Sequence, residues 1–193
     1  METKNIMIVG VGGQGSLLAS KLLGNLLMNK GYDVKVSEVH GMSQRGGSVV
    51  TYVRYGDKVY SPIIDKGEAD IIISFELLEA ARWVEYLKPN GTIISNTQEI
   101  MPMPVIAGTA KYPENLVEKI SALGINIVAF DALSLAKEAG NAKSVNIVLM
   151  GAASRFFDFD DEAWQGAIDR CVPQKFLELN KKAFELGLNV KVD

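Results

Sequence analysis

The stretch that decides the fold spans residues 6–47 and reads IMIVGVGGQGSLLASKLLGNLLMNKGYDVKVSEVHGMSQRGG. An apolar strand at 6–9 leads into the glycine-rich loop 10–15, and leucines at three- and four-residue steps then predict a helix. A second strand, 34–39, ends in a second glycine-rich loop, 40–47. This order predicts a β-α-β unit in which both loops leave the same edge of the sheet, after neighbouring strands. We expect the function to lie at that edge.

The rest of the chain alternates predicted strands and helices. Expected strands lie at 48–55, 58–60, 70–75, 92–95 and 125–130, and expected helices at 76–87, 115–123, 132–139, 144–156, 160–170 and 173–186. The strand 48–55, a turn at 56–57 and the return at 58–60 predict an antiparallel hairpin. We therefore expect an α/β fold: a Rossmann-like, doubly wound, mostly parallel sheet with an added antiparallel hairpin and a helical C-terminal section. No linker divides the chain, which predicts a single domain over residues 1–193.

Composition excludes several classes of function. The net charge of -3 argues against a nucleic-acid groove, which needs clustered lysine and arginine. No apolar run reaches the roughly 18 residues of a membrane helix. The chain enters a strand almost at once, so we expect no signal peptide and no membrane association, and a cytoplasmic protein.

Rare residues exclude resident metal chemistry. The chain has one cysteine, Cys171, and one histidine, His40. One thiol cannot form an internal disulfide, and an iron–sulfur cluster needs about four thiolates. A structural zinc site is excluded for the same reason. We therefore expect no metal site, and any redox metal that this protein works with must lie on another chain.

The first glycine loop has the spacing of a phosphate-binding turn. Gly10 permits a tight turn, Gly12 would let a phosphate approach the backbone, and Gly15 opens the helix, where free N–H groups favour an anion. Glu38 ends the second strand, 23 positions after Gly15, near the distance expected for a ribose-binding acid. The alternative is that these glycines serve strand–helix packing alone and that Glu38 is solvated.

Gly13 and Gln14 complicate the interpretation of the first loop as a plain dinucleotide turn. The Gln14 amide could donate a hydrogen bond into the same cleft, which a dinucleotide loop does not need.

The second glycine loop is dense in polar groups. Its glycines would let backbone N–H groups form a concavity for anions. Arg45 offers a planar guanidinium group for a carboxylate or phosphate, and the reference pKa of histidine lies near neutrality, so His40 could move a proton. The alternative is a surface loop with His40 packed against Tyr52 or Tyr55. The position at a strand end favours function, for a set of six residues: His40, Ser43, Gln44, Arg45, Gly46 and Gly47.

At this point the sequence resembles a known family. The segments are GVGGQG at 10–15, EVHGMSQRGG at 38–47, YSP at 60–62 and GEAD at 67–70. They are similar to the gamma domain of the 2-oxoacid:ferredoxin oxidoreductases, and most of all to the small (beta) subunit of the indolepyruvate type. The resemblance spans nearly the whole chain, and the serine–glutamine pair before Arg45 is its most specific element.

The resemblance implies a role in a complex. In this family thiamine diphosphate and [4Fe-4S] clusters lie on the large (alpha) subunit, where a 2-oxoacid is decarboxylated, coenzyme A takes the acyl group and electrons pass to ferredoxin. This chain would then bind no cofactor firmly and would be inactive alone. His40 and Arg45 become candidate supporting catalytic residues. The candidate cofactor-binding residues are Gly10, Gly12, Gly13, Gln14, Gly15, Ser43, Gln44, Gly46 and Gly47.

Two other functions remain open at this stage: a free-standing NAD(P)- or FAD-binding Rossmann protein and a non-catalytic nucleotide-binding module. Outside the loops, Glu76 is expected to cap a helix rather than to serve a site, and Cys171 to be an inert thiol. Met101 and Met103 lie in a proline-rich segment and suit an adaptable apolar surface for subunit contact.

Overall fold

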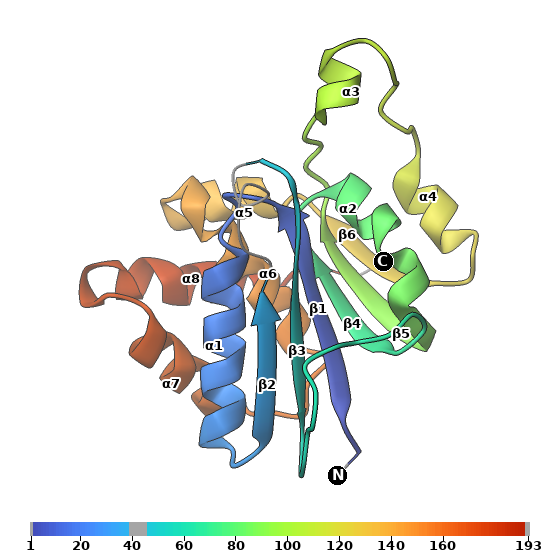
Figure 1. Ribbon diagram of the computed structural model, residues 1–193. Helices are drawn as coiled ribbons and strands as arrows, with labels where there is room; N and C mark the ends of the chain where they lie inside the picture. Colours follow the sequence, from blue (N-terminus) through green and yellow to red (C-terminus); the bar gives the residue numbers. More distant parts are fainter. Residues whose placement is uncertain (1, 39–45, 192–193) are drawn as a thin grey trace.

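One mixed sheet organises the computed structural model, which describes residues 2–38 and 46–191 (Figure 1). The order of its six strands in that part of the chain is β2-β3-β1-β4-β5-β6. These strands are β1 (Lys4–Val11), β2 (Asp33–Glu38), β3 (Ser48–Gly56), β4 (Ala69–Ser74), β5 (Leu87–Asn96) and β6 (Asn126–Phe130). β1, β4, β5 and β6 are parallel, whereas β3 is antiparallel to both β1 and β2. The predicted α/β class is confirmed.

Helices cover both faces of the sheet, as expected for a doubly wound fold. One face packs against α1 (Ser16–Asn29), α5 (Ala132–Ala139), α6 (Val145–Ser154), α7 (Asp161–Cys171) and α8 (Leu177–Leu188). The other face packs against α2 (Leu77–Arg82) and α4 (Leu116–Ser121), while α3 (Met103–Ile106) projects away from the sheet (Figure 1). Short 3-10 turns complete the elements: η2 (Val84–Tyr86), η3 (Ala142–Ser144) and η4 (Gln174–Phe176). No helix among the described residues is both long and apolar enough to span a bilayer.

Strand alternation divides the core between these two layers. In β1, Ile6 and Ile8 face the α1 layer, whereas Met7 and Val9 face the α2 layer. The apolar helix α6 is buried along its whole length, so its expected place in the core is confirmed. Gly151 of α6 and Gly187 of α8 permit the close crossing of these helices, because a Cβ at Gly187 would lie 1.9 Å from a carbonyl oxygen of α6.

The predicted neighbours of β1 were wrong. β3, rather than β2, lies beside β1 and separates the two parallel strands. The predicted return strand at 58–60 is also wrong, because the hairpin is formed by β2 and β3. The segment after β3 is held by a side chain instead: the Val59 N–H donates to Asp33 Oδ2 at 2.9 Å. Since β1 and β2 still point the same way, their two loops do leave the same edge.

The segment 76–91 also differs from its prediction. The helix ends at Arg82, and β5 begins at Leu87, so the Pro-Asn-Gly sequence lies inside a strand rather than in a turn. The structure accommodates it by a register shift in the β4–β5 pairing, with Asn90 at a φ of 65°.

Candidate functional site

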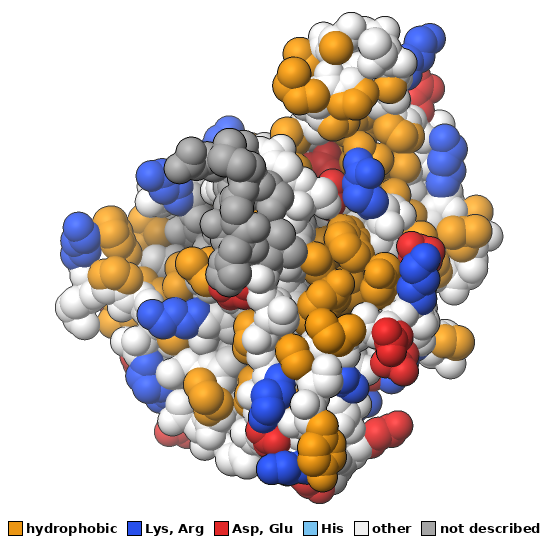
Figure 2. All heavy atoms as spheres, in the orientation of Figure 1, with side chains coloured by type: hydrophobic (Ala, Val, Ile, Leu, Met, Phe, Trp, Pro, Cys, Tyr) orange, Lys and Arg blue, Asp and Glu red, His pale blue; other side chains and the backbone are white. Residues whose placement is uncertain are grey.

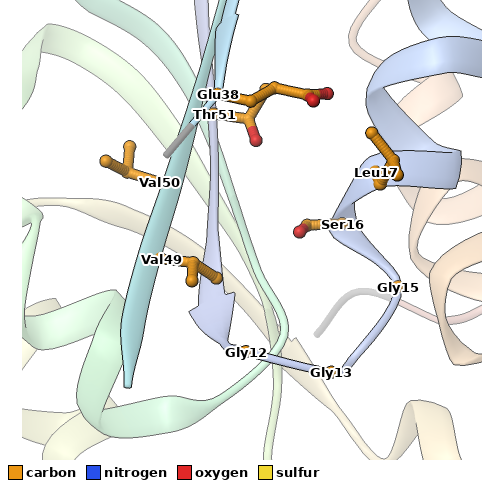
Figure 3. A pocket seen from close by; sticks show the side chains of 9 residues that line it. All are labelled: Gly12, Gly13, Gly15, Ser16, Leu17, Glu38, Val49, Val50 and Thr51. Carbon is orange, nitrogen blue, oxygen red and sulfur yellow. The ribbon is translucent and has the colours of Figure 1, made fainter. Parts of the chain in front are cut away.

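A cavity of about 270 Å³ opens between the start of α1 and the β2–β3 hairpin (Figure 3). It is lined by Gly12, Gly13, Gly15, Ser16, Leu17, Glu38, Val49, Val50 and Thr51. The structure thus brings together the first glycine loop and the acid at the end of β2, as predicted. Figure 3 shows Ser16 pointing from α1 toward β3, and Glu38 pointing from the hairpin toward α1.

Glu38 is held in place by a helix residue. Ser20 Oγ donates to Glu38 Oε1 at 2.7 Å, which fixes the carboxylate at the mouth of the cavity beside Leu17. Among the nine described lining residues, Glu38 is the one carboxylate, and the other polar side chains are the hydroxyls of Ser16 and Thr51. Such a lining suits the binding of a partly apolar ligand with hydroxyl groups, and it offers no nucleophile paired with a base.

The glycines of the first loop are required by its backbone. Gly13 and Gly15 have φ values of 99° and 92°, in the left-handed region that glycine tolerates best. Gly10 has no room for a side chain, because a Cβ there would come within 2.9 Å of the Phe75 side chain and 2.8 Å of Gln14 Oε1. The conformation and packing of the loop therefore explain why glycine occupies these positions. Cofactor binding by these residues stays a prediction.

A backbone hydrogen bond joins the two glycine loops. The Gly12 N–H donates to the Gly47 carbonyl oxygen at 2.9 Å. This N–H is directed at protein rather than at a ligand, and the approach of a phosphate to the backbone at Gly12 stays a prediction. Gly46 follows the pattern of the first loop, with a φ of 101°. His40, Ser43, Gln44 and Arg45 lie outside the described residues, so their predicted roles stay predictions.

Gln14 ties the first loop to the end of β4. Its Oε1 accepts from the Val11 N–H at 2.7 Å, and its Nε2 donates to the Phe75 carbonyl oxygen at 3.1 Å and to Gln98 Oε1 at 3.5 Å. The side chain lines a second cavity, of about 410 Å³, together with Gly13, Gly15, Gln98, Leu133, Ala142, Lys143 and Val145. The first loop is thus flanked by two cavities, and Gln14 lies on the side away from Glu38.

Three buried polar side chains that the sequence reasoning missed support the loops. The Asn96 amide donates to the Phe75 carbonyl oxygen at 3.2 Å, and its oxygen accepts from the Ala132 N–H at 3.1 Å. Asn146 donates to the Gly15 carbonyl oxygen at 3.2 Å. The signal for Asn146 was its polar side chain within an otherwise nearly apolar predicted helix.

Glu79 is the third of these residues, and it holds the end of the second loop. Ser48, the first residue of β3, donates to Glu79 Oε2, and Trp83 Nε1 donates to the same oxygen at 3.2 Å. Arg82 Nε completes the set by donating to Glu79 Oε1 at 3.1 Å. Glu79 is 4% exposed, so the carboxylate is buried and bonded on both oxygens.

Glu76 and Cys171 have the roles that the sequence favoured. Glu76 caps α2, because its carboxylate accepts from the Glu79 N–H at 2.8 Å. Cys171 is half-buried at the end of α7, and burial raises the pKa of its thiol, which disfavours the reactive thiolate.

Residues 5–190 match the family described as pyruvate ferredoxin/flavodoxin oxidoreductase. The chain belongs to this family. The predicted gamma-domain resemblance is therefore confirmed, and the loops described above are those of a pyruvate ferredoxin/flavodoxin oxidoreductase domain.

Individual members of the family agree over nearly their full length. The chain is 46% identical to "Indolepyruvate oxidoreductase subunit IorB" of Thermococcus kodakarensis, covering 97% of this chain and 96% of that protein. The gamma subunit of a keto/oxoacid ferredoxin oxidoreductase from Geobacter sulfurreducens has a similar structure, with a TM-score of 0.70, 25% identity and 95% coverage of both chains. The 2-oxoglutarate:ferredoxin oxidoreductase of Magnetococcus marinus shares the fold, with a TM-score of 0.71 and 18% identity. In that protein the match covers 97% of this chain and 31% of the longer one.

Proposed function

We propose that this chain is the small subunit of a 2-oxoacid:ferredoxin oxidoreductase that acts on indolepyruvate or related aryl pyruvates. The observation that carries the proposal is the 46% identity, over nearly the whole of both chains, to a subunit of an indolepyruvate oxidoreductase. This full-length agreement also favours the small subunit over a free-standing nucleotide-binding protein.

The large (alpha) subunit would carry the redox chemistry. With one cysteine and one histidine, the residues of this chain do not fit an iron–sulfur cluster, which needs about four thiolates. Thiamine diphosphate and [4Fe-4S] clusters are therefore assigned to the partner, together with transfer of electrons to ferredoxin. Coenzyme A is the co-substrate that accepts the acyl group, in keeping with the coenzyme A bound in the 2-oxoglutarate enzyme of Magnetococcus marinus.

This chain would contribute the carboxyl edge of its sheet, with the hydrogen-bonded glycine loops, to the active-site region of the complex. The two glycine loops meet through Gly12 and Gly47, and Glu38 borders the cavity beside them. His40 and Arg45, with the rest of the second loop, would complete the active-site region of the complex. They would support binding and catalysis there rather than catalyse alone.

Anaerobic reconstitution tests this assignment. The purified chain alone should not reduce ferredoxin with any 2-oxoacid. Together with the thiamine-containing large subunit from the same host, it should support coenzyme A-dependent reduction with indolepyruvate or phenylpyruvate, and much less with pyruvate or 2-oxoglutarate. Activity of the chain by itself would overturn the proposal, and so would a large subunit that is fully active without it.

A further inference from the structure

Residues 99–112 form an arm that rises above the carboxyl edge of the sheet, with α3 near its tip (Figure 1). The arm leaves the sheet after β5 and returns before α4, so it starts from the same edge as the first glycine loop. Its tip is an ordered turn, since the Ala107 N–H donates to the Met103 carbonyl oxygen at 2.8 Å and the Thr109 N–H to that of Pro104 at 2.9 Å.

One buried carboxylate holds both ends of the arm. Glu76 is 1% exposed, and its Oε1 accepts from the Ile100 N–H at 2.9 Å and from the Tyr112 hydroxyl at 2.6 Å. Tyr112 is fixed further, because its hydroxyl accepts from the Leu78 N–H at 3.1 Å. The arm is thus pinned to the start of α2 at its entry and its exit, which sets its direction before any partner arrives.

The surface of the arm is apolar between its two ends, which carry the charged residues Glu99 and Lys111. No charged residue occurs between 100 and 110, where the sequence reads IMPMPVIAGTA. Met103 is 70% exposed and Ile106 is 66% exposed, and Figure 2 shows apolar side chains gathered on this projection. Apolar side chains that are held out in water, on a segment pinned at its base, mark an interaction surface.

We propose that this arm is the docking element by which the chain binds its large partner subunit, inserting Met103 and Ile106 into an apolar depression on that subunit. The inference rests on the proposed function, which supplies the partner. The absence of charge between 100 and 110 calls for an uncharged partner surface, and methionine adapts well to such a pocket. In the Magnetococcus marinus enzyme the matching part covers 31% of the chain, so the same fold occurs there next to a much larger remainder of protein.

The position of the arm favours the large subunit over a second copy of this chain. It rises from the edge that carries the candidate site, so a partner that completes this site would meet the arm at the same time. If the arm instead bound a second copy of this chain, that contact would bring neither thiamine diphosphate nor iron–sulfur clusters to the glycine loops.

A matched pair of variants tests the docking. Met103→Glu places a charge on the arm, and Met28→Glu places the same charge on α1, at a methionine that is 60% exposed near the opposite edge of the sheet. The tagged chain is bound anaerobically to the purified large subunit, identified by mass spectrometry and its thiamine diphosphate content, and Kd is measured by interferometry. Met103→Glu should weaken binding about tenfold or more, as for a residue at the centre of an interface, whereas Met28→Glu should bind like the wild type. Thermal melts of the three free chains confirm that each is folded.

The outcomes separate the two proposals. A wild-type chain that does not bind the large subunit overturns the proposed function. Normal binding by both the wild type and Met103→Glu overturns the docking inference alone. Loss of self-association in Met103→Glu, with binding to the large subunit unchanged, assigns the arm to a second copy and also overturns it. Hydrogen exchange over 100–110 should slow in the complex if the arm is buried there.

Discussion

The Gly12 N–H and the Gly47 carbonyl oxygen lie 2.9 Å apart and form a hydrogen bond that links the two glycine loops. The link lies beside Ser48, whose hydroxyl bonds the buried Glu79 of α2. These two hydrogen bonds therefore connect the first loop, the second loop and α2 at the carboxyl edge of the sheet. A change in any one of the three is expected to affect the geometry of the candidate site.

Removal of the Glu79 side chain should lower the free energy of unfolding more than removal of an exposed acidic side chain. Glu79→Ala leaves the Ser48 hydroxyl and Trp83 Nε1 without their acceptor, so the free energy of unfolding should fall by about 1–3 kcal/mol. Urea unfolding measures this loss. In the control Glu85→Ala, which removes an exposed ion pair with Lys66, the loss should stay below about 1 kcal/mol. Equal losses in the two variants would mean that Glu79 does not anchor β3.

A side chain at Gly15 should strain the first loop. Gly15→Ala forces a non-glycine residue to a φ of 92°, and its Cβ would lie 3.0 Å from the Asn146 amide. We expect a loss of about 1–2 kcal/mol in unfolding free energy, together with a change at the cavity. Gly166→Ala is the matched control, because Gly166 lies inside α7 and a Cβ there would meet the flexible end of the Arg170 side chain at 3.1 Å, so the free energy of unfolding should change by less than about 1 kcal/mol. A neutral Gly15→Ala would show that the loop relaxes freely.

Tyr112 should make stability fall at alkaline pH. Burial and the hydrogen bond to Glu76 raise the pKa of its hydroxyl above the usual value. The neutral phenol is favoured in the folded state, so its contribution is complete below the unfolded pKa of about 10 and is lost as pH rises above it. Tyr112→Phe should therefore flatten the decline in unfolding free energy between about pH 9 and about pH 11.

The exposed Tyr60 provides the control for this titration. Tyr60→Phe should leave the alkaline decline as in the wild type, since Tyr60 is 89% exposed. Burial also raises the pKa of Tyr55, so part of the decline should remain in Tyr112→Phe. Identical pH profiles for Tyr112→Phe and the wild type would contradict the role of this hydroxyl.

Arg45 should matter in the assembled complex and not for folding. Arg45→Ala removes the guanidinium fork from the second loop, and we expect kcat/KM for indolepyruvate or coenzyme A to fall about tenfold or more. Arg170→Ala, on α7, removes a surface hydrogen bond to Asn25 and should leave these kinetics unchanged. Wild-type kinetics in the Arg45→Ala complex would remove the proposed role of the second loop.

The alternation of elements could be predicted from the sequence, but the strand order could not. Periodicity within a segment reports which faces are buried, and it gave the α/β class and the fully buried α6. It does not report which segment pairs with which, so the partners of β3, which are β1 and β2, do not follow from the pattern. The Pro-Asn-Gly sequence at 89–91 likewise predicts a turn, because a strand that accommodates such residues through a register shift has the same local sequence pattern.

At the site, the sequence predicted the meeting of Glu38 with the first glycine loop and missed the side chains behind it. Glycine spacing is a local signal, whereas Glu79, Asn96 and Asn146 act through contacts with residues 21 to 131 positions away. Their functions depend on the tertiary arrangement, which only the structure provides.

The insertion of β3 beside β1 makes the second glycine loop a hairpin connection, closed by the pairing of Glu38 with Thr51 at its base. Such a connection can gain, lose or exchange residues while the ladder beneath it keeps its register. A change of sequence within that segment is therefore expected to leave the β2–β3 ladder, and the sheet to which it belongs, intact.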